Sequence, residues 1–180
     1  MSDSEWFRDV YIQTYADLTR FVVRRLHPPE RAEDVVAEAF TVAWQRLGDL
    51  PDELDDARAW LFGITRRLLL AEHRADRRGR ALAVRIAEHA AVDTLEHDDL
   101  VATSVDLVSS WQRLAPAQQE ALSLSVWEGL SAGQAAAVLG ISPVAFRIRL
   151  SRARRALQRH LSHVCAAGPS SLATSAEGHA

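Results

Sequence analysis

Residues 131–161 read "SAGQAAAVLGISPVAFRIRLSRARRALQRHL", a stretch with six arginines and no acidic residue. Ser131 can cap a helix that Gly140 ends, because serine favours the N-cap and glycine the C-terminal cap. Ser142 can cap a second helix with Pro143 at its first position, where a missing N–H has no cost. A helix, a short glycine-containing turn and a longer helix form a helix-turn-helix arrangement.

The second of these helices has two different faces. At about 100° per residue, one face is an apolar stripe of Phe146, Leu150, Ala153, Leu157 and Leu161. The opposite face carries Arg147, Arg152, Arg155 and Arg159, together with Val144, Ile148 and Ser151. A solvated face usually mixes charges, whereas this helix repels itself unless a polyanion neutralises it. Exposed Val144 and Ile148 also suit contact with thymine methyl groups in a major groove. The pattern therefore predicts DNA binding, with a solvated helix or an acidic protein partner as the alternatives.

Charge is distributed in blocks along the 180 residues, although the net charge is only −3. Residues 1–64 sum to −6, 65–80 to +4, 81–128 to −6 and 129–163 to +6. Two basic blocks that alternate with acidic ones are typical of separate nucleic-acid contacts. The single cysteine, Cys165, excludes an internal disulfide and a cysteine-based zinc site. The sequence lacks an apolar run of the roughly 20 residues that a membrane span needs, and its start lacks a signal-peptide pattern, so we expect a cytoplasmic protein.

Helical spacing dominates the first third of the chain as well. A first apolar stripe, ended by "HPP" at 27–29, consists of Phe7, Val10, Tyr11, Leu18, Phe21, Val22 and Leu26. A second helix is expected over 30–47, with an apolar side of Val36, Phe40, Ala43, Trp44 and Leu47. A third is expected from about Ala57 to about Arg78, with a buried stripe of Leu61, Ile64 and Leu68. Strand-like alternation is absent, so we predict an all-α fold of two small helical domains.

The polar faces of the second and third helices are also distinctive. On the second helix, Asp34, Glu38, Thr41 and Gln45 fall opposite the apolar side. On the third, the face opposite the buried stripe carries Arg66, Arg67, Arg74, Arg77, Arg78 and Arg80, with Trp60 at its edge. Basic and aromatic groups on one exposed face suit single-stranded or melted nucleic acid, whose bases can stack. The alternative is that Trp60 belongs to the core and the arginines are solvated.

Three motifs in this order resemble a bacterial extracytoplasmic-function (ECF) RNA polymerase sigma factor. They are "RAEDVVAEAFTVAW", "ARAWLFGITRRLLLAEHRADRR" and "LSAGQAAAVLGISPVAFRIRLSRARRAL". Each motif alone is a weak signal, since helix-turn-helix proteins are numerous, but their order and spacing are specific. The resemblance covers about residues 5–162.

The resemblance implies a role for each face. The second helix would dock on core RNA polymerase through Asp34, Glu38, Thr41 and Gln45, with Arg46 beside them. The third helix would melt and hold the minus-10 promoter element, which points to Trp60, Arg66, Arg67, Arg74 and Arg77. The last helix would read the minus-35 element through Arg147, Ile148, Ser151 and Arg152, with Arg149 and Arg155 on phosphates. The implied partners are core RNA polymerase, promoter DNA and, as a further candidate, an anti-sigma factor; no membrane, metal or cofactor is implied.

The resemblance also implies a domain division, with two local departures from the family pattern. We expect a sigma region 2 domain over 5–79, an acidic linker over 80–106, a sigma region 4 helix-turn-helix domain over 107–163 and a disordered tail over 164–180. Arg67 stands where the family often has asparagine, which puts the capture of a flipped minus-10 base in doubt. Gly133 and Ala135 stand where larger or charged residues are common, which predicts looser packing of this module.

Other functions explain less of the sequence. A stand-alone helix-turn-helix regulator would need only the C-terminal module and would leave "EDVVAEAF" unexplained. An adaptor that binds polymerase without reading DNA would not need two basic helices. The cluster "EHDDL" at 96–100 gathers a histidine with three acids, but no supporting ligand follows elsewhere, and adjacent Glu72 and His73 point in different directions. We therefore do not expect an enzyme.

Overall fold

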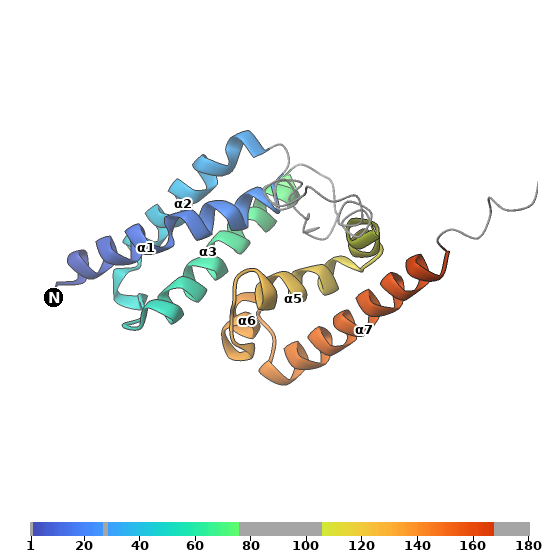
Figure 1. The fold of residues 1–180 in the computed structure, drawn as a ribbon. Helices are drawn as coiled ribbons and strands as arrows, with labels where there is room; N and C mark the ends of the chain where they lie inside the picture. The colour runs from blue at the N-terminus through green and yellow to red at the C-terminus, as the bar shows by residue number, and fades with distance from the viewer. Residues whose placement is uncertain (1, 27–28, 76–105, 168–180) are drawn as a thin grey trace, which may run out of the picture.

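The computed structural model describes residues 2–26, 29–75 and 106–167 of the 180 (Figure 1). Within these ranges the chain is helical and contains no strand, so the predicted all-α class is confirmed. The long elements are α1 (Asp3–Val23), α2 (Ala32–Gln45), α3 (Leu54–Ala75), α5 (Pro116–Val126), α6 (Ala132–Leu139) and α7 (Pro143–Ala167), with short 3-10 turns η1 (Pro29–Arg31) and η2 (Leu47–Asp49). Residues 106–112 form a further helical turn ahead of α5.

The helix boundaries of the C-terminal module follow from its capping residues. The Ser131 hydroxyl accepts a hydrogen bond from the Gln134 backbone N–H at 3.3 Å, and the Gln134 side chain accepts one in return from the Ser131 N–H at 3.0 Å. Gly140 ends α6 in the left-handed conformation, at φ 67°. The Ser142 hydroxyl accepts from the Ala145 N–H at 3.1 Å, and α7 begins at Pro143. The predicted helix-turn-helix is therefore confirmed at both ends of its turn.

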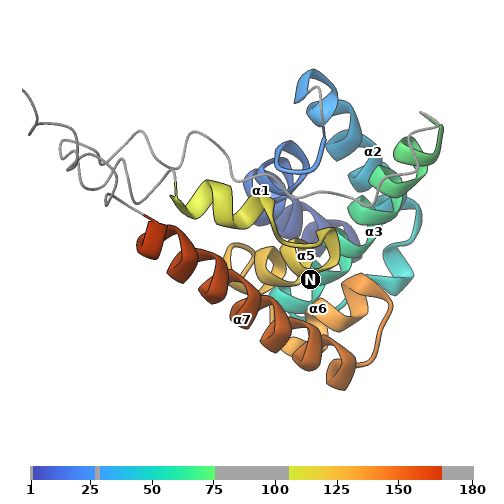
Figure 2. The same ribbon diagram turned by 90° about the vertical axis from the view of Figure 1, so that its right-hand side faces the viewer.

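The helices are arranged in layers around α3. One side of α3 packs against α1 and α2, and its other side packs against α6, which in turn packs against α7 with α5 (Figures 1 and 2). A single hydrophobic core runs through these layers, from Phe21 of α1 and Phe62 of α3 to Leu124 of α5 and Phe146 of α7. The Phe21 and Phe62 ring centroids are 4.8 Å apart. A smaller apolar cluster supports the middle of α7 and consists of Trp111, Leu114, Leu122, Ala153 and Ala156.

The central position of α3 makes its buried surface wider than the sequence pattern predicts. Leu61 and Ile64 are buried as expected, whereas Leu68 is only partly buried. Additional α3 residues are buried, namely Ala57, Ala59, Phe62, Thr65 and Leu69. A helix covered on two sides has no single apolar stripe, so the prediction of one stripe opposite a free basic face was wrong for much of this helix.

Small residues allow α6 to approach α3 closely. Ala135 is fully buried, Ala136 is almost fully buried, and both belong to the continuous core. A Cβ atom added to Gly63 of α3 would lie 3.9 Å from the Cα of Val138 in α6, an ordinary van der Waals contact. The cleft at this contact is lined by Gly133 and Ala137 of α6 and by Ala59 and Gly63 of α3. The expected loosening of this module at Gly133 and Ala135 stays a prediction.

The limits of the described ranges bear on two further predictions. The expected acidic linker lies almost wholly outside the described residues, and so does most of the expected tail. Helix α7 continues to Ala167, past residue 163, where the last domain was expected to end. In the part of the chain that the structure describes, no helix is both long enough and apolar enough to cross a membrane.

Candidate nucleic-acid interface

The outer face of α7 is exposed along its N-terminal half. Arg147, Ser151, Arg152 and Arg155 are exposed, and Arg149 is partly exposed. Val144 and Ile148 leave 59% and 48% of their surface exposed, a large fraction for apolar residues in a folded helix. On the opposite face, Phe146 and Ala153 are buried. The structure therefore brings together the side chains that the sequence placed on one DNA-facing surface.

The arginines on this face have no acidic partner among the described residues. Among the described residues, the hydrogen bond made by these arginines stays within the helix, where Arg159 Nε donates to the Arg155 carbonyl oxygen at 3.4 Å. Like charges along one face repel each other in the free protein. Phosphate groups would relieve this repulsion, so the surface is chemically suited to a polyanion.

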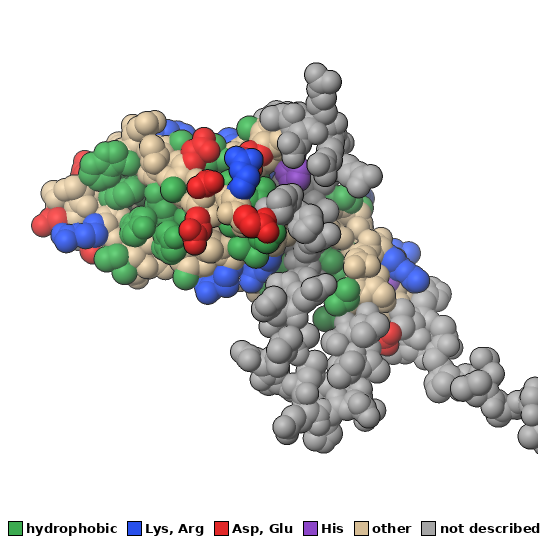
Figure 3. All heavy atoms as spheres, turned by 90° about the horizontal axis from the view of Figure 1, so that it is seen from above, with side chains coloured by type: hydrophobic (Ala, Val, Ile, Leu, Met, Phe, Trp, Pro, Cys, Tyr) green, Lys and Arg blue, Asp and Glu red, His purple; other side chains and the backbone are tan. Residues whose placement is uncertain are grey.

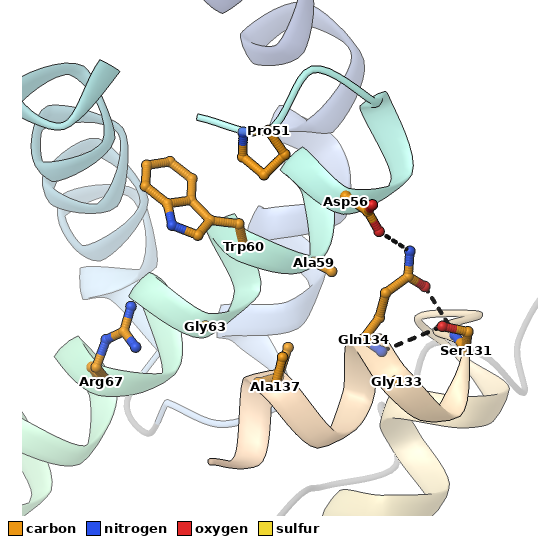
Figure 4. Close-up of a pocket in the computed structure, with 11 residues that line it drawn as sticks. Pro51, Asp56, Ala59, Trp60, Gly63, Arg67, Ser131, Gly133, Gln134 and Ala137 are labelled. Atoms are coloured by element: carbon orange, nitrogen blue, oxygen red, sulfur yellow. Dashed lines mark hydrogen bonds between the residues drawn. The ribbon is translucent and has the colours of Figure 1, made fainter. Parts of the chain in front are cut away.

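The corresponding face of α3 lies beside a cleft between α3 and α6. The cleft has a volume of about 470 Å³, and Trp60 and Arg67 line its α3 side (Figure 4). Trp60 is partly buried and packs against the core, and the Arg46 guanidinium lies 5.6 Å from its ring centroid. Arg67 is exposed. The side chain of Arg74 and the whole of Arg77 lie outside what the structure describes.

Arg66 differs sharply from its neighbour Arg67. Its Nε donates to Glu120 Oε1 at 2.6 Å and its Nη2 to Glu120 Oε2 at 3.1 Å. The two side chains are only 18% and 7% exposed. In this arrangement Arg66 is bound to α5 rather than free for nucleic acid. Sequence reasoning missed this pair, because Glu120 lies 54 positions from Arg66.

The polar face of α2 is exposed as predicted. Asp34, Glu38, Thr41 and Gln45 are all exposed, and the Thr41 hydroxyl donates to the Ala37 carbonyl oxygen at 2.8 Å. Arg46 follows directly after α2 and forms a paired contact with Asp49, at 3.0 Å from Nε and 2.7 Å from Nη2. The carboxylates of this face remain open to a basic partner.

Aromatic side chains border this face, which the sequence analysis did not recognise. Tyr11 and Trp44, predicted to belong to buried stripes, are 41% and 49% exposed. They pack against Phe7 and Phe40, with ring centroids 5.1 Å apart for Phe7 and Trp44 and 4.6 Å apart for Tyr11 and Phe40. Figure 3 shows hydrophobic side chains gathered toward the end where α1 begins, with acidic side chains next to them. The four-residue spacing of these aromatics was the available signal, but it also fits a buried stripe.

Among residues 2–26, 29–75 and 106–167, no three His, Cys, Asp or Glu side chains lie close enough together to hold a metal ion. Glu72 is engaged by Arg31, with Oε1 at 2.7 Å from Nη2. The acidic cluster at 96–100 lies outside the described residues.

Two protein families match the chain, one over each of the two regions that carry these faces. The Sigma-70 region 2 family matches residues 10–79, which include the α2 and α3 faces. The Sigma-70, region 4 family matches residues 106–157, which include α5, α6 and the exposed face of α7.

Individual relatives support the same class. The chain is 34% identical to the ECF RNA polymerase sigma factor SigC of Mycobacterium tuberculosis, over 80% of this chain and 77% of the relative. It is 32% identical to the ECF RNA polymerase sigma factor BldN of Streptomyces coelicolor, over 88% of this chain but only 61% of that relative's length. The chain belongs to the ECF RNA polymerase sigma factor family.

Solved structures agree on the fold. The sigma factor RpoE, solved with the anti-sigma factor NepR from Bartonella quintana, is 24% identical and superposes with a TM-score of 0.62 over 87% of this chain and 96% of that one. CnrH, solved with the cytosolic domain of CnrY, is 26% identical with a TM-score of 0.59 over 89% of this chain and 90% of that one.

Proposed function

We propose that this chain directs core RNA polymerase to promoters with two recognition elements and acts there as an initiation factor, not as an enzyme. The observation that carries the proposal is the exposed face of α7 on the second helix of a helix-turn-helix. There the arginines have no acidic partner among the described residues, and Val144 and Ile148 protrude. A sigma factor with this role works in the cytoplasm with polymerase and promoter DNA. An anti-sigma factor remains a candidate partner, since the similar RpoE was solved with one.

The minus-35 element would be read by α7. Arg147, Ile148, Ser151 and Arg152 are exposed on the N-terminal half of the helix, which is the part that enters the major groove in this motif. Arginine can donate two hydrogen bonds to a guanine edge, and Ile148 can contact a thymine methyl group. We assign Arg149 and Arg155 to phosphate contacts, which position the helix without reading sequence.

The minus-10 element would be held by α3. Trp60 offers an aromatic surface and Arg67 a free guanidinium on the same helix, a combination suited to unstacked bases. Arg66 would join them once it leaves Glu120. We assign Arg74 and Arg77 to this surface as well, on the family resemblance alone.

Core polymerase would dock on α2. Asp34 and Glu38 lie one turn apart on an exposed face, which complements a basic surface and steers association. Thr41, Gln45 and Arg46 continue this face toward the end of the helix. Tyr11 and Trp44 beside it supply the aromatic character that protein interfaces favour.

Run-off transcription from a promoter library tests the function as a whole. Core polymerase should initiate at defined sites only when the chain is added. The variant Asp34→Arg/Glu38→Arg should no longer co-purify with core polymerase, because its α2 face becomes repulsive. Its matched control is Asp52→Arg/Glu53→Arg, in which two exposed acids ahead of α3 undergo the same change in charge. Equal co-purification of the two variants would contradict the assignment of α2.

A stand-alone DNA-binding regulator is the second candidate, favoured by one observation. The face of α7 is exposed even while the face of α3 is largely covered, so α7 could contact duplex DNA without polymerase. This function predicts sequence-specific duplex binding by the chain alone and no initiation in the run-off assay.

A further inference from the structure

The cleft between α3 and α6 is hollow because small residues face each other across it (Figure 4). Helix α3 contributes Ala59 and Gly63 to its lining, and α6 contributes Gly133 and Ala137. A Cβ atom added to Gly133 would have no closer neighbour than the Ser131 hydroxyl, at 4.0 Å. The resulting space of about 470 Å³ lies within the size range of pockets that bind small molecules.

The polar groups at the end of the cleft where α6 begins are bonded to one another. Gln134 Nε2 donates to Asp56 Oδ1 at 2.7 Å, and Gln134 Oε1 accepts from the Ser131 N–H at 3.0 Å (Figure 4). The Ser131 hydroxyl accepts from the Gln134 backbone N–H at 3.3 Å. The Asp56 carboxylate also makes this end repulsive to an anion, because like charges repel. A charged ligand group is therefore directed to the other end of the cleft if it is negative.

That other end carries the cationic residue of the lining, Arg67 (Figure 4). Arg67 is exposed and forms no ion pair with any residue that the structure describes. Its neighbour Arg66, by contrast, is bound to Glu120. A free guanidinium binds a carboxylate through two parallel hydrogen bonds, in a fixed planar geometry. Arg67 is thus placed to hold an anionic group at the mouth of the cleft.

Between the two ends the lining is apolar, and Trp60 is its largest side chain. The other members of this middle part are small or aliphatic, namely Pro51, Ala59, Gly63, Ala137 and Val138. An indole favours flat aromatic rings, which stack on it with an offset or meet it edge-on. Apart from the indole N–H, these side chains carry no polar group, so sugar hydroxyls would lose their bonds to water here without replacement.

We propose that this cleft binds a small aromatic carboxylate, with its ring beside Trp60 and its carboxylate on Arg67. A nucleotide fits less well, because its ribose would lie against the apolar middle part. The binding itself does not depend on the role assigned to α3 at a promoter. One consequence does rest on that proposed function: the ligand occupies Trp60 and Arg67, so it competes with single-stranded DNA for them.

The first test measures binding of 2-naphthoate by NMR titration of the full-length protein labelled with nitrogen-15. We expect saturable shifts of the Gly63 and Gly133 amides and of the Trp60 indole N–H, with a dissociation constant in the millimolar range that is usual for a ligand of this size. Arg67→Gln should weaken binding roughly tenfold, which is about the effect of one charge-assisted hydrogen bond. Arg8→Gln, the same change at an exposed arginine of α1, is the matched control. Equal affinities of these two variants would overturn the proposal.

The second test fills the cleft. Ala137→Leu adds a larger side chain to the lining at an exposed helical position, where leucine is well tolerated. Ala16→Leu makes the same change at an exposed position of α1. We expect Ala137→Leu to lose the saturable shifts at Gly63 and Gly133, whereas Ala16→Leu keeps them. Undiminished binding by Ala137→Leu would place the ligand elsewhere and contradict the site.

Comparison ligands test the chemical class. Naphthalene-2-methanol has the same ring without the charge, so we expect it to bind more weakly than 2-naphthoate and to be insensitive to Arg67→Gln. Cyclohexanecarboxylate has the charge without the aromatic ring and should also bind more weakly. Adenosine monophosphate that binds as tightly as 2-naphthoate, with shifts of the same amides, would assign the cleft to nucleotides and overturn the carboxylate assignment.

Competition with a fluorescent single-stranded DNA separates this inference from the proposed function. Displacement of the DNA by 2-naphthoate supports both. Saturable naphthoate binding that leaves DNA binding unchanged keeps the ligand site and contradicts the assignment of α3 to the minus-10 element. A chain that initiates in the run-off assay but shows no naphthoate-induced shifts keeps the proposed function and overturns the ligand site.

Discussion

Helices α3 and α7 look alike in sequence and behave differently in the folded protein. Each combines an apolar stripe with several arginines, and the same argument assigned both to DNA. In α7 the arginine face is exposed and lacks acidic partners among the described residues, whereas in α3 the face is largely covered and Arg66 is bound to Glu120. A basic helix face is therefore exposed only where no second layer of helices packs on it. The composition of a helix does not reveal whether such a layer is present.

The largest expected difference between the two helices is in stability. Arg66→Ala leaves the buried Glu120 carboxylate without its partner, so we expect the free energy of unfolding to fall by about 2–3 kcal/mol, somewhat less than for a fully buried pair. Arg152→Ala removes an exposed side chain and should change it by no more than about 0.5 kcal/mol. Urea denaturation followed by circular dichroism measures both, with Arg67→Ala as the exposed control on α3. A loss for Arg66→Ala as small as that for Arg67→Ala would mean that the ion pair contributes little.

A second, smaller effect should separate two arginines within α7. Arg152→Ala should relax the preference at one or two minus-35 positions, since a good arginine–guanine pair contributes about 1–3 kcal/mol of discrimination. Arg159→Ala should weaken binding equally on all sequences and lower the salt slope by about one. Duplex binding across a randomised minus-35 element at two salt concentrations gives both values. Uniform weakening by both substitutions would make α7 a phosphate anchor.

The smallest expected effect is a dependence of stability on pH. It arises where Glu128 packs beside α3, and the face of α7, which carries no acidic residue, lacks it. Burial raises the pKa of Glu128 above its ordinary value, although Arg25, Arg24 and Arg58 partly oppose this. Burial also lowers the pKa of Arg25 to about 10, although attraction by Glu128 and Glu120 opposes this shift. The folded protein thus holds the Glu128 proton more tightly than the unfolded chain, in which the carboxylate is solvated. Its extra stability is fully present below the ordinary glutamate pKa and is lost as pH rises through the raised value.

Urea denaturation at several pH values, with Glu128→Gln as the reference, would measure this contribution. We expect the contribution of Glu128 to the free energy of unfolding to increase as pH falls from neutral toward the ordinary glutamate range. A contribution that decreases over that interval would contradict the predicted sign. The variant Glu30→Gln should leave the profile unchanged, because Glu30 is exposed.

Local chemistry made part of the fold predictable. The ends of α6 and the start of α7 were correctly placed because Ser131, Gly140 and Ser142 act on backbone groups only a few residues away. The exposed α7 face was predictable for the same reason, since its side chains share one helix. Whether those side chains perform the assigned roles is a separate question, which remains a prediction.

The Arg66–Glu120 pair could not be predicted from local pattern. Arg66 and Glu120 are 54 residues apart, and nothing near either residue indicates the other. Phe62 and Leu69 look misplaced if α3 has a single apolar stripe, and they are explained only by a second layer. Trp44 was assigned to the core because four-residue aromatic spacing cannot distinguish a buried stripe from an exposed rim.

The small residues between α3 and α6 also determine how much side-chain entropy this contact costs. Alanine has no side-chain rotamers to lose on burial, whereas a buried leucine or methionine gives up about 0.5–2 kcal/mol of rotamer freedom. Ala59 and Gly63 of α3 and Gly133 and Ala137 of α6, which line the cleft between the two helices, therefore lose almost no rotamer freedom there. If exposed, these small side chains would add little apolar surface on which other chains could aggregate.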